Sequence, residues 1–170
     1  PTVKLVNSTR LNRMERGPER RAANLAELGI ELPAVAAPVA AYVPAVVHGG
    51  LVYTSGQLPF VDGALPATGK VGAEVSAEDA QRFARLAALN AIAAVDDLVG
   101  IDNVARVLKI VGFVASDASF TGQPGVINGA SELLGAAFGD AGVHARSAVG
   151  VAVLPLDAPV EVEITVAVAD

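Results

Sequence analysis

The sequence predicts a single α+β domain in which a mixed β-sheet carries two helices on one face. The chain has 170 residues, of which 52% are apolar and 18% are charged, so its length and composition fit one hydrophobic core. Its apolar segments follow the order hairpin, long helix, strand, helix and last hairpin. Because strands and helices do not alternate strictly, this order favours a mixed sheet over a doubly wound parallel sheet.

The N-terminal part is predicted to be a basic leader with a short helix, residues 1–34, ahead of one domain at 35–170. Residues 1–22 hold six basic and two acidic side chains, a net charge of +4, whereas six basic and sixteen acidic side chains give the remainder −10. The helix is expected over residues 17–28, where a proline stands in the first turn. Because an acidic body repels phosphate, nucleic acid is not the expected partner.

Two strands are expected at residues 43–48 and 51–55, because the Gly-Gly pair between them suits a tight hairpin. Residues 32–61 contain no charged side chain, a length that would suit a membrane span. Four prolines and three glycines interrupt this segment and would break a helix, and the N-terminus shows no signal peptide. We therefore expect a cytoplasmic protein without a membrane span.

The second half of the chain supplies the remaining elements. Ser76 and the acidic residues after it form a capping signature that predicts a helix of about 23 residues ending near Gly100. A β-branched run predicts the next strand, a second helix follows it, and two final strands are joined by a Pro-rich link. These elements are expected at residues 104–115, 123–138, 145–154 and 160–168.

One face of the predicted sheet would remain uncovered and would consist mainly of Val and Ala. Large exposed apolar faces are rare in monomers. A second subunit is the simplest cover for this face, and we therefore expect a homo-oligomer.

The residue inventory limits the chemistry. The chain has no cysteine, which removes thiol catalysis, disulfides and thiolate metal sites. Its two histidines, His48 and His144, lie far apart in sequence, so neither a Ser-His-Asp relay nor a His-rich metal site is expected. We therefore expect no metal site, and carboxylate chemistry remains possible.

Arg146 is the most informative single residue, because no other Lys or Arg follows Lys109. Strand alternation places it on one face with Ala148, Gly150 and another alanine, which predicts space beside the cation. A guanidinium in such a space could bind a carboxylate through two parallel hydrogen bonds. The alternative is a structural salt bridge with Glu161 or Glu163 on the neighbouring strand.

The same two glutamates are candidates for catalysis. Glu161 and Glu163 lie two residues apart on one face of the last strand, and either could hold a water as a general base. The alternative is a solvated or salt-bridged face. Whether this face is shared with Arg146 depends on strand register, since a slip of one residue reverses it. Further uncharged polar groups, each of which could also be a cap or a satisfied polar group, are Tyr42, Ser55, Gln57 and Asn128.

Several stretches together resemble the Rid family of reactive intermediate deaminases, also called YjgF. They are Tyr42, LVYTSGQLP at 51–59, FVASDASF at 113–120, VINGAS at 126–131 and HARSAVGVAVLPLDAPVEVE at 144–163. The resemblance covers roughly residues 38–169. The combination of SGQ, RS and a closing LP followed by VEVE carries it.

The resemblance implies a chorismate-mutase-like subunit that assembles into homotrimers with ligand clefts between neighbouring subunits. It also implies hydrolysis of small 2-imino acids to 2-keto acids and ammonia without a cofactor. By motif, Arg146 would bind the substrate carboxylate, Glu161 would position the attacking water, and further residues would line the cleft. These lining residues are Tyr42, Ser55 and Asn128.

The chain also departs from the family pattern. Ala148 stands where deaminases often have cysteine, so only its backbone carbonyl could hold a water there. About four residues are inserted before Asn128, and the leader is additional. A non-catalytic module that binds small carboxylates or a protein is therefore an alternative, and an endoribonuclease or translation inhibitor is a further one that the acidic body disfavours. A tautomerase that uses Pro1 is disfavoured by the polar leader.

Overall fold

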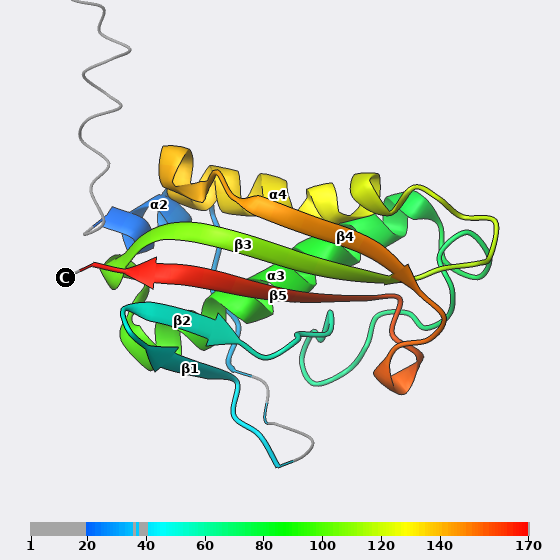
Figure 1. Ribbon diagram of the computed structural model, residues 1–170, viewed down its shortest axis with the longest axis horizontal. Coiled ribbons are helices and arrows are strands. Elements are labelled where there is room, and N and C mark those ends of the chain that lie inside the picture. Colours follow the sequence, from blue (N-terminus) through cyan, green and yellow to red (C-terminus); the bar gives the residue numbers. More distant parts are fainter. Residues whose placement is uncertain (1–19, 36, 38–40, 170) are drawn as a thin grey trace, which may run out of the picture.

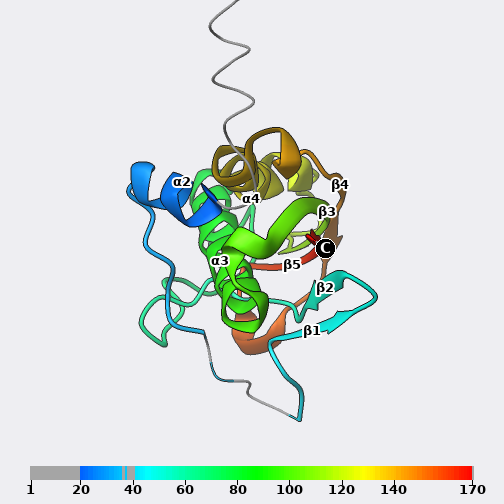
Figure 2. The ribbon, with the colours of Figure 1, turned by 90° about the vertical axis from the view of Figure 1, so that its left-hand side faces the viewer.

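A computed structural model describes residues 20–35, 37 and 41–169, and it forms one five-stranded sheet with its helices on one side (Figure 1). The strand order is β1-β2-β5-β3-β4. Turning the molecule by 90° shows α3 and α4 together on one side of the sheet (Figure 2), so the predicted α+β class is confirmed. The strands are β1 (Ala45–His48), β2 (Leu51–Thr54), β3 (Val104–Ala115), β4 (Ala145–Val151) and β5 (Val160–Val168), and the helices are α2 (Arg21–Glu27), α3 (Ala77–Val99) and α4 (Gln123–Phe138).

The predicted first hairpin is confirmed. β1 and β2 pair antiparallel, and Gly49 and Gly50 join them with φ angles of 58° and 76°. Positive φ at both central residues is the geometry of the tight turn that matches strand twist, and glycine adopts it without steric cost. The long uncharged segment of the sequence thus contains a hairpin. Among the described residues, no helix is both long and apolar enough to cross a bilayer.

Helix α3 follows the prediction closely. The Ser76 hydroxyl accepts a hydrogen bond from the backbone N–H of Asp79 at 3.1 Å, and the helix ends before Gly100. Its alanine face is fully buried and allows close packing on the sheet and on α4. The two helices approach so closely that a Cβ added to Gly129 would overlap the carbonyl oxygen of Gln81.

The predicted last hairpin is wrong. β4 pairs parallel to β3, and β5 pairs antiparallel to β3 on its other side, so β3 separates the two strands. Helix α4 is the reason, because it carries the chain back along the sheet and makes β3, α4 and β4 a parallel crossover unit. β5 is then enclosed between β2 and β3, and β4 remains at the edge.

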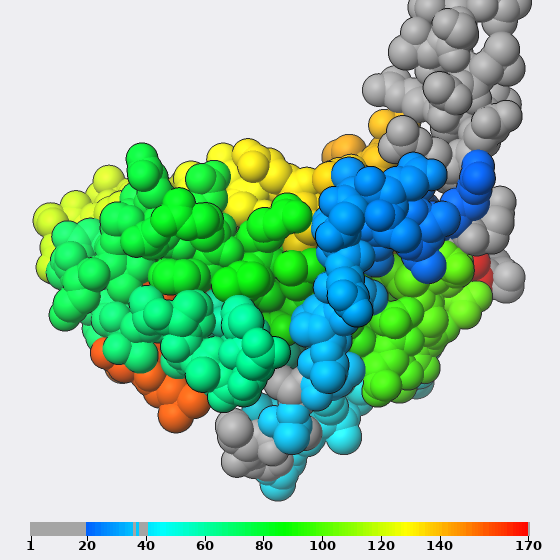
Figure 3. All heavy atoms as spheres, turned by 180° about the vertical axis from the view of Figure 1, so that it is seen from behind, coloured from blue at the N-terminus to red at the C-terminus, as the bar shows by residue number. Residues whose placement is uncertain are grey.

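The described part of the leader, residues 20–34, packs on the helix layer. The Arg21 guanidinium donates to the carbonyl oxygens of Phe138, at the end of α4, and of Ala105, at 3.1 and 3.3 Å. The backbone N–H of Ala22 donates to Asp102 at 2.8 Å. Seen from behind, the blue segment after Arg20 lies across the helices (Figure 3). The short predicted helix is therefore present and ends before Leu28, and its predicted first residues, 17–19, lie outside the described part.

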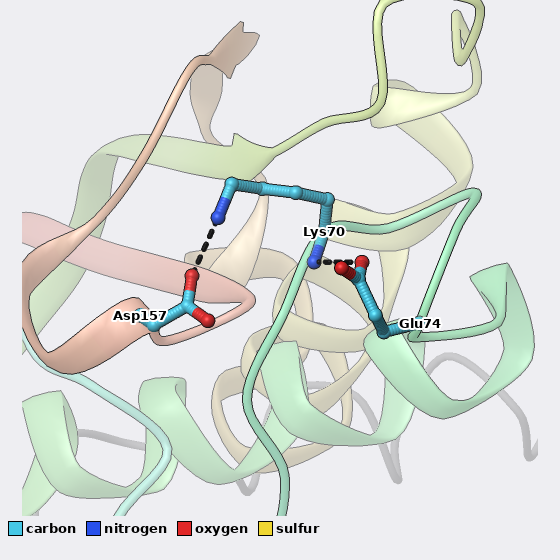
Figure 4. A network of polar contacts seen from close by, with 3 residues as sticks. All are labelled: Lys70, Glu74 and Asp157. Carbon is cyan, nitrogen blue, oxygen red and sulfur yellow. Dashed lines mark hydrogen bonds and ion pairs between the residues drawn. The ribbon is translucent and has the colours of Figure 1, made fainter.

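A polar network holds the connection into β5. Lys70 Nζ donates to Asp157 at 2.5 Å, and the Lys70 backbone N–H donates to Glu74 at 2.9 Å (Figure 4). Deeper in the molecule, the Asn90 amide donates to the carbonyl oxygens of Leu58 and Phe60. These contacts tie the long loop after β2 to α3 and to the residues just before Glu161.

Candidate active site

Arg146 lies on the edge strand β4 and faces helix α4. Its Nη1 donates to Asn128 Oδ1 at 2.8 Å and to Ser131 Oγ at 3.2 Å, and its Nη2 donates to the carbonyl oxygen of Pro124 at 3.2 Å. All three acceptors are uncharged groups of α4. Within residues 20–35, 37 and 41–169, no acidic group lies within salt-bridge distance of this guanidinium. The structural salt bridge offered as an alternative is therefore absent from this part of the chain.

Two N–H groups of Arg146 have no acceptor in the described residues. A guanidinium has five N–H groups, two on each terminal nitrogen and one on Nε. Both N–H groups of Nη1 and one of Nη2 have acceptors in α4. The two without an acceptor in the described residues are Nε–H and one N–H of Nη2. Nε and Nη2 form one edge of the guanidinium, and this edge has the spacing of a carboxylate, which it can bind through two parallel hydrogen bonds.

The small residues beside Arg146 have a different role from the predicted one. Ala148 packs against the main core, and a Cβ added to Gly150 would lie 2.8 Å from Gln123 Nε2 and 3.2 Å from Ser116 Oγ. The row shares the face of Arg146 as predicted. These small residues let α4 pack closely on β4, however. The open space predicted beside Arg146 is therefore not present along the whole strand.

Glu161 and Glu163 face the other side of the sheet. The register aligns Arg146 with Ile110, which is fully buried beneath the helices, whereas Glu161 is aligned with Phe113. Since side chains alternate along a strand, Glu161 and Glu163 lie on the sheet face without helices. Within one chain, the predicted carboxylate binder and the predicted base are therefore not brought together.

The environment of Glu161 is crowded and half-buried. A Cβ added to Gly56 would lie 2.7 Å from both Cδ and Oε1 of Glu161, so glycine is required for the carboxylate to occupy this place. Gln57 pairs with Val162 through two backbone hydrogen bonds, which holds the Gly56 turn against β5. Burial, and to a smaller extent the charge of Glu163, raises the pKa of Glu161 above its ordinary value.

Ser55 and Tyr42 belong to the same region as Gly56. The Ser55 hydroxyl donates to the carbonyl oxygen of Val43 at 2.6 Å, and its backbone N–H donates to Pro44. This ties the end of β2 to the segment that follows Tyr42, whose side chain is exposed. We call Glu161, Gly56 and the adjacent Ser55 the carboxylate cluster, and Tyr42 makes no hydrogen bond to it in the described residues.

The second group surrounds the arginine, and the sequence indicated it only in part. Ser131 lies one helical turn after Asn128, and its hydroxyl lies 2.9 Å from His144 Nε2. His144 Nδ1 lies 2.6 Å from the carbonyl oxygen of Gly142. The signals were the i, i+3 spacing of Asn128 and Ser131 and the position of His144 two residues before Arg146. We call Arg146, Asn128, Ser131 and His144 the cation cluster.

Comparison with known proteins gives consistent results. A family model described as "YjgF/chorismate_mutase-like, putative endoribonuclease" matches residues 22–167. Protein TCP17 of Trypanosoma cruzi is 47% identical over 146 residues, which cover 85% of this chain and 91% of TCP17. The crystal structure of Atu1372 from Agrobacterium tumefaciens, of unknown function, is 42% identical with a TM-score of 0.81, covering 89% of this chain and 94% of Atu1372. TdcF of E. coli, solved with bound serine, is 29% identical with a TM-score of 0.58, covering 82% of this chain and 96% of TdcF.

Proposed function

From the premise that this chain belongs to the YjgF/chorismate mutase-like family, we propose that it hydrolyses small 2-imino or enamino acids to 2-keto acids and ammonia. The observation that carries the proposal is the open edge of Arg146. This guanidinium is held from behind by neutral groups only, so its charge is not compensated by an acid within the described chain. A compact organic anion with one carboxylate is the ligand that such an edge fits best. The bound serine of TdcF, also a small carboxylate, supports this ligand class.

The reaction needs a base as well as an anion-binding group. In the imine, water adds to the carbon that carries the nitrogen, and the resulting carbinolamine loses ammonia to leave the ketone. Glu161 takes a proton from the attacking water and passes it to the imine nitrogen, and it then transfers the carbinolamine hydroxyl proton to the amino group that leaves as ammonia, so no external reagent is consumed. Its raised pKa supports this role, because a base with a pKa closer to neutrality also serves as the acid. The Ala148 backbone carbonyl is a further candidate to hold the water.

The arrangement of the two clusters supports assembly. Arg146 faces the helices from an edge strand, and Glu161 faces the open side of the sheet two strands away. A complete site therefore needs Glu161 from a neighbouring copy beside Arg146. Exposed apolar side chains on the open face, Val46, Tyr53 and Val149, favour its burial against other copies. We infer a homotrimer with one site at each subunit boundary.

Replacing Arg146 tests the proposal. We expect Arg146→Ala to lower kcat/KM about a hundredfold, because the substrate carboxylate then lacks its charged partner. The measurement couples the protein to a threonine dehydratase and follows 2-ketobutyrate formation above the spontaneous rate. Equal rates for Arg146→Ala and the unaltered protein would remove the proposal.

A second candidate is a carboxylate-binding protein without turnover. It is favoured by the separation of Arg146 from Glu161 within one chain. Calorimetry would then detect 2-ketobutyrate binding that depends on Arg146, while the coupled assay would show no acceleration. Endoribonuclease activity, which the family description names, is disfavoured by the acidic charge of the chain outside the leader.

A further inference from the structure

Ser131 and His144 form a chain of hydrogen bonds that ends on Arg146. A backbone carbonyl can only accept a hydrogen bond, so the 2.6 Å contact with Gly142 O places a proton on His144 Nδ1. In the neutral imidazole, Nε2 is then an acceptor, and the Ser131 hydroxyl 2.9 Å away donates to it. With its proton directed to His144, the Ser131 oxygen presents its lone pairs to Arg146 Nη1 at 3.2 Å.

The same distances could describe a serine nucleophile and its base, but the placement argues against that role. Ser131 contacts Nη1, the nitrogen that Asn128 also binds. The open edge of Arg146 consists of Nε and Nη2, on the other side of the guanidinium. A carboxylate on that edge would therefore lie away from the Ser131 hydroxyl. Ser131 acts on the ligand only through the arginine.

We propose that Ser131 and His144 are positioning residues that hold the Arg146 guanidinium in its carboxylate-binding orientation. This inference rests on the proposed role of Arg146. Arginine has a long side chain with several rotatable bonds, and ordering it on binding costs affinity. Three hydrogen bonds from α4 fix the group in advance, and one of them exists because His144 orients the Ser131 hydroxyl. The geometry thus assigns a function to a histidine and a serine that neither contact substrate nor belong to the core.

The test measures binding of 2-ketobutyrate by calorimetry, together with KM and kcat in the coupled assay. We expect Ser131→Ala and His144→Phe to raise Kd and KM about three- to tenfold, as loss of one hydrogen bond implies, with kcat changed less than about twofold. Ser131→Thr keeps the hydroxyl and His144→Gln keeps an acceptor, so both should restore most of the affinity. Ser119→Ala, which removes a hydroxyl bound to Asp117 instead, is the matched control.

A double-mutant cycle separates positioning from a general structural role. In an Arg146→Lys background the ammonium has no Nη1 for Ser131 to hold. Ser131→Ala should then cause no further loss of affinity. An equal loss in both backgrounds would overturn the inference, as would wild-type affinity of Ser131→Ala. Covalent labelling of Ser131 by a fluorophosphonate would also overturn it, because the serine would then be a nucleophile.

A measurement without ligand keeps the inference testable if the proposed reaction fails. The ¹⁵N order parameter of the Arg146 Nε–H group, assigned by its disappearance in Arg146→Lys, should fall in Ser131→Ala and His144→Phe. It should be unchanged in Ser119→Ala. If the protein shows no turnover but these shifts occur, the proposed function fails and the positioning role stands. If turnover depends on Arg146 while the order parameter does not change, the positioning role fails alone.

Discussion

The cation cluster and the carboxylate cluster hold opposite charges by opposite means. Arg146 is fixed by three hydrogen bonds to neutral groups of one helix, and its Nε–H and one Nη2 N–H have no acceptor in the described chain. Glu161 is held by the space that Gly56 leaves, and no hydrogen bond offsets its burial in the described chain. The first cluster is thus prepared to bind a charge, whereas the second is prepared to take up a proton.

Glu161→Gln should have the largest effect, a loss in kcat of about 10²- to 10⁴-fold with KM changed only a few-fold. The amide retains the shape of the side chain and removes the base, so the result separates the chemical step from binding. The coupled 2-ketobutyrate assay measures both constants. Glu163→Gln, two residues along the same face, is the matched control. A greater loss in that control would identify Glu163 as the base.

Mixing two inactive variants tests whether the clusters of different subunits meet. Co-expressed Arg146→Ala and Glu161→Gln chains should recover about one quarter of the unaltered activity, because random assembly pairs an intact arginine with an intact neighbouring glutamate in about one site in four. Two affinity tags purify the mixed oligomers for the coupled assay. Activity no higher than that of the separate variants would place both residues of a site in one chain.

Gly56→Ala should disturb the carboxylate cluster alone. The new methyl group would lie 2.7 Å from the Glu161 carboxylate and displace it, and we expect kcat to fall about ten- to a hundredfold. Affinity for 2-ketobutyrate should fall much less, because Arg146 is untouched. Gly135→Ala is the control, since its Cβ meets nothing within 4 Å and should stabilise α4 by about 0.5 to 1 kcal/mol. A normal kcat in Gly56→Ala would mean that the glutamate works from another position.

The smallest expected effect is on the way the stability of the fold depends on pH. Burial and then Glu163 raise the pKa of Glu161 above its ordinary 4.5, so the folded chain binds this proton more tightly than the unfolded chain. That contribution to stability is full below pH 4.5 and is lost as the pH rises through the folded pKa. Glu161→Gln should therefore melt higher than the unaltered protein at neutral pH, by a few degrees at most, and equally near pH 4.

A control of opposite sign is available in the loop after β2. The backbone N–H of Lys70 donates to Glu74, and this hydrogen bond lowers the pKa of the exposed Glu74 carboxyl. Glu74→Gln should therefore melt slightly lower than the unaltered protein at neutral pH, with the difference lost as the pH falls below 4.5. Thermal melts at several pH values measure both variants. If Glu74→Gln and Glu161→Gln changed the melting temperature at neutral pH in the same direction, the opposite pKa shifts of the two carboxyl groups would be contradicted.

Local sequence signals were sufficient to predict the elements whose formation depends on residues close together in the sequence. The Ser76 cap, the Gly49-Gly50 turn and the β-branched run of β3 each act within a few residues, and the predicted boundaries agree with the structure there. The pairing of β4 and β5 could not be predicted in this way. Both segments are rich in Val and are joined by a short link in the sequence, and only the path of α4 determines that β3 lies between them.

For the candidate site, too, the sequence predicted single residues but not how they are arranged. Arg146, Asn128 and Glu161 were found from residue type and motif, but their relation depends on register and on strand order. The salt-bridge alternative assumed adjacent strands, and the structure removes it for that reason. Ser131 and His144 were missed as a pair, because thirteen positions separate them in sequence and only the packing of α4 on β4 brings them together.

The sequence alone determined the fold class, the main helix and strand positions and a single arginine suited to an anion, because propensity, capping and composition act locally. The tertiary structure alone decided which donors of that arginine stay open, which face each glutamate occupies and which side chains support the guanidinium. These are consequences of how strands are ordered and how closely helices pack. They depend on contacts between residues far apart in the chain, which no local pattern encodes.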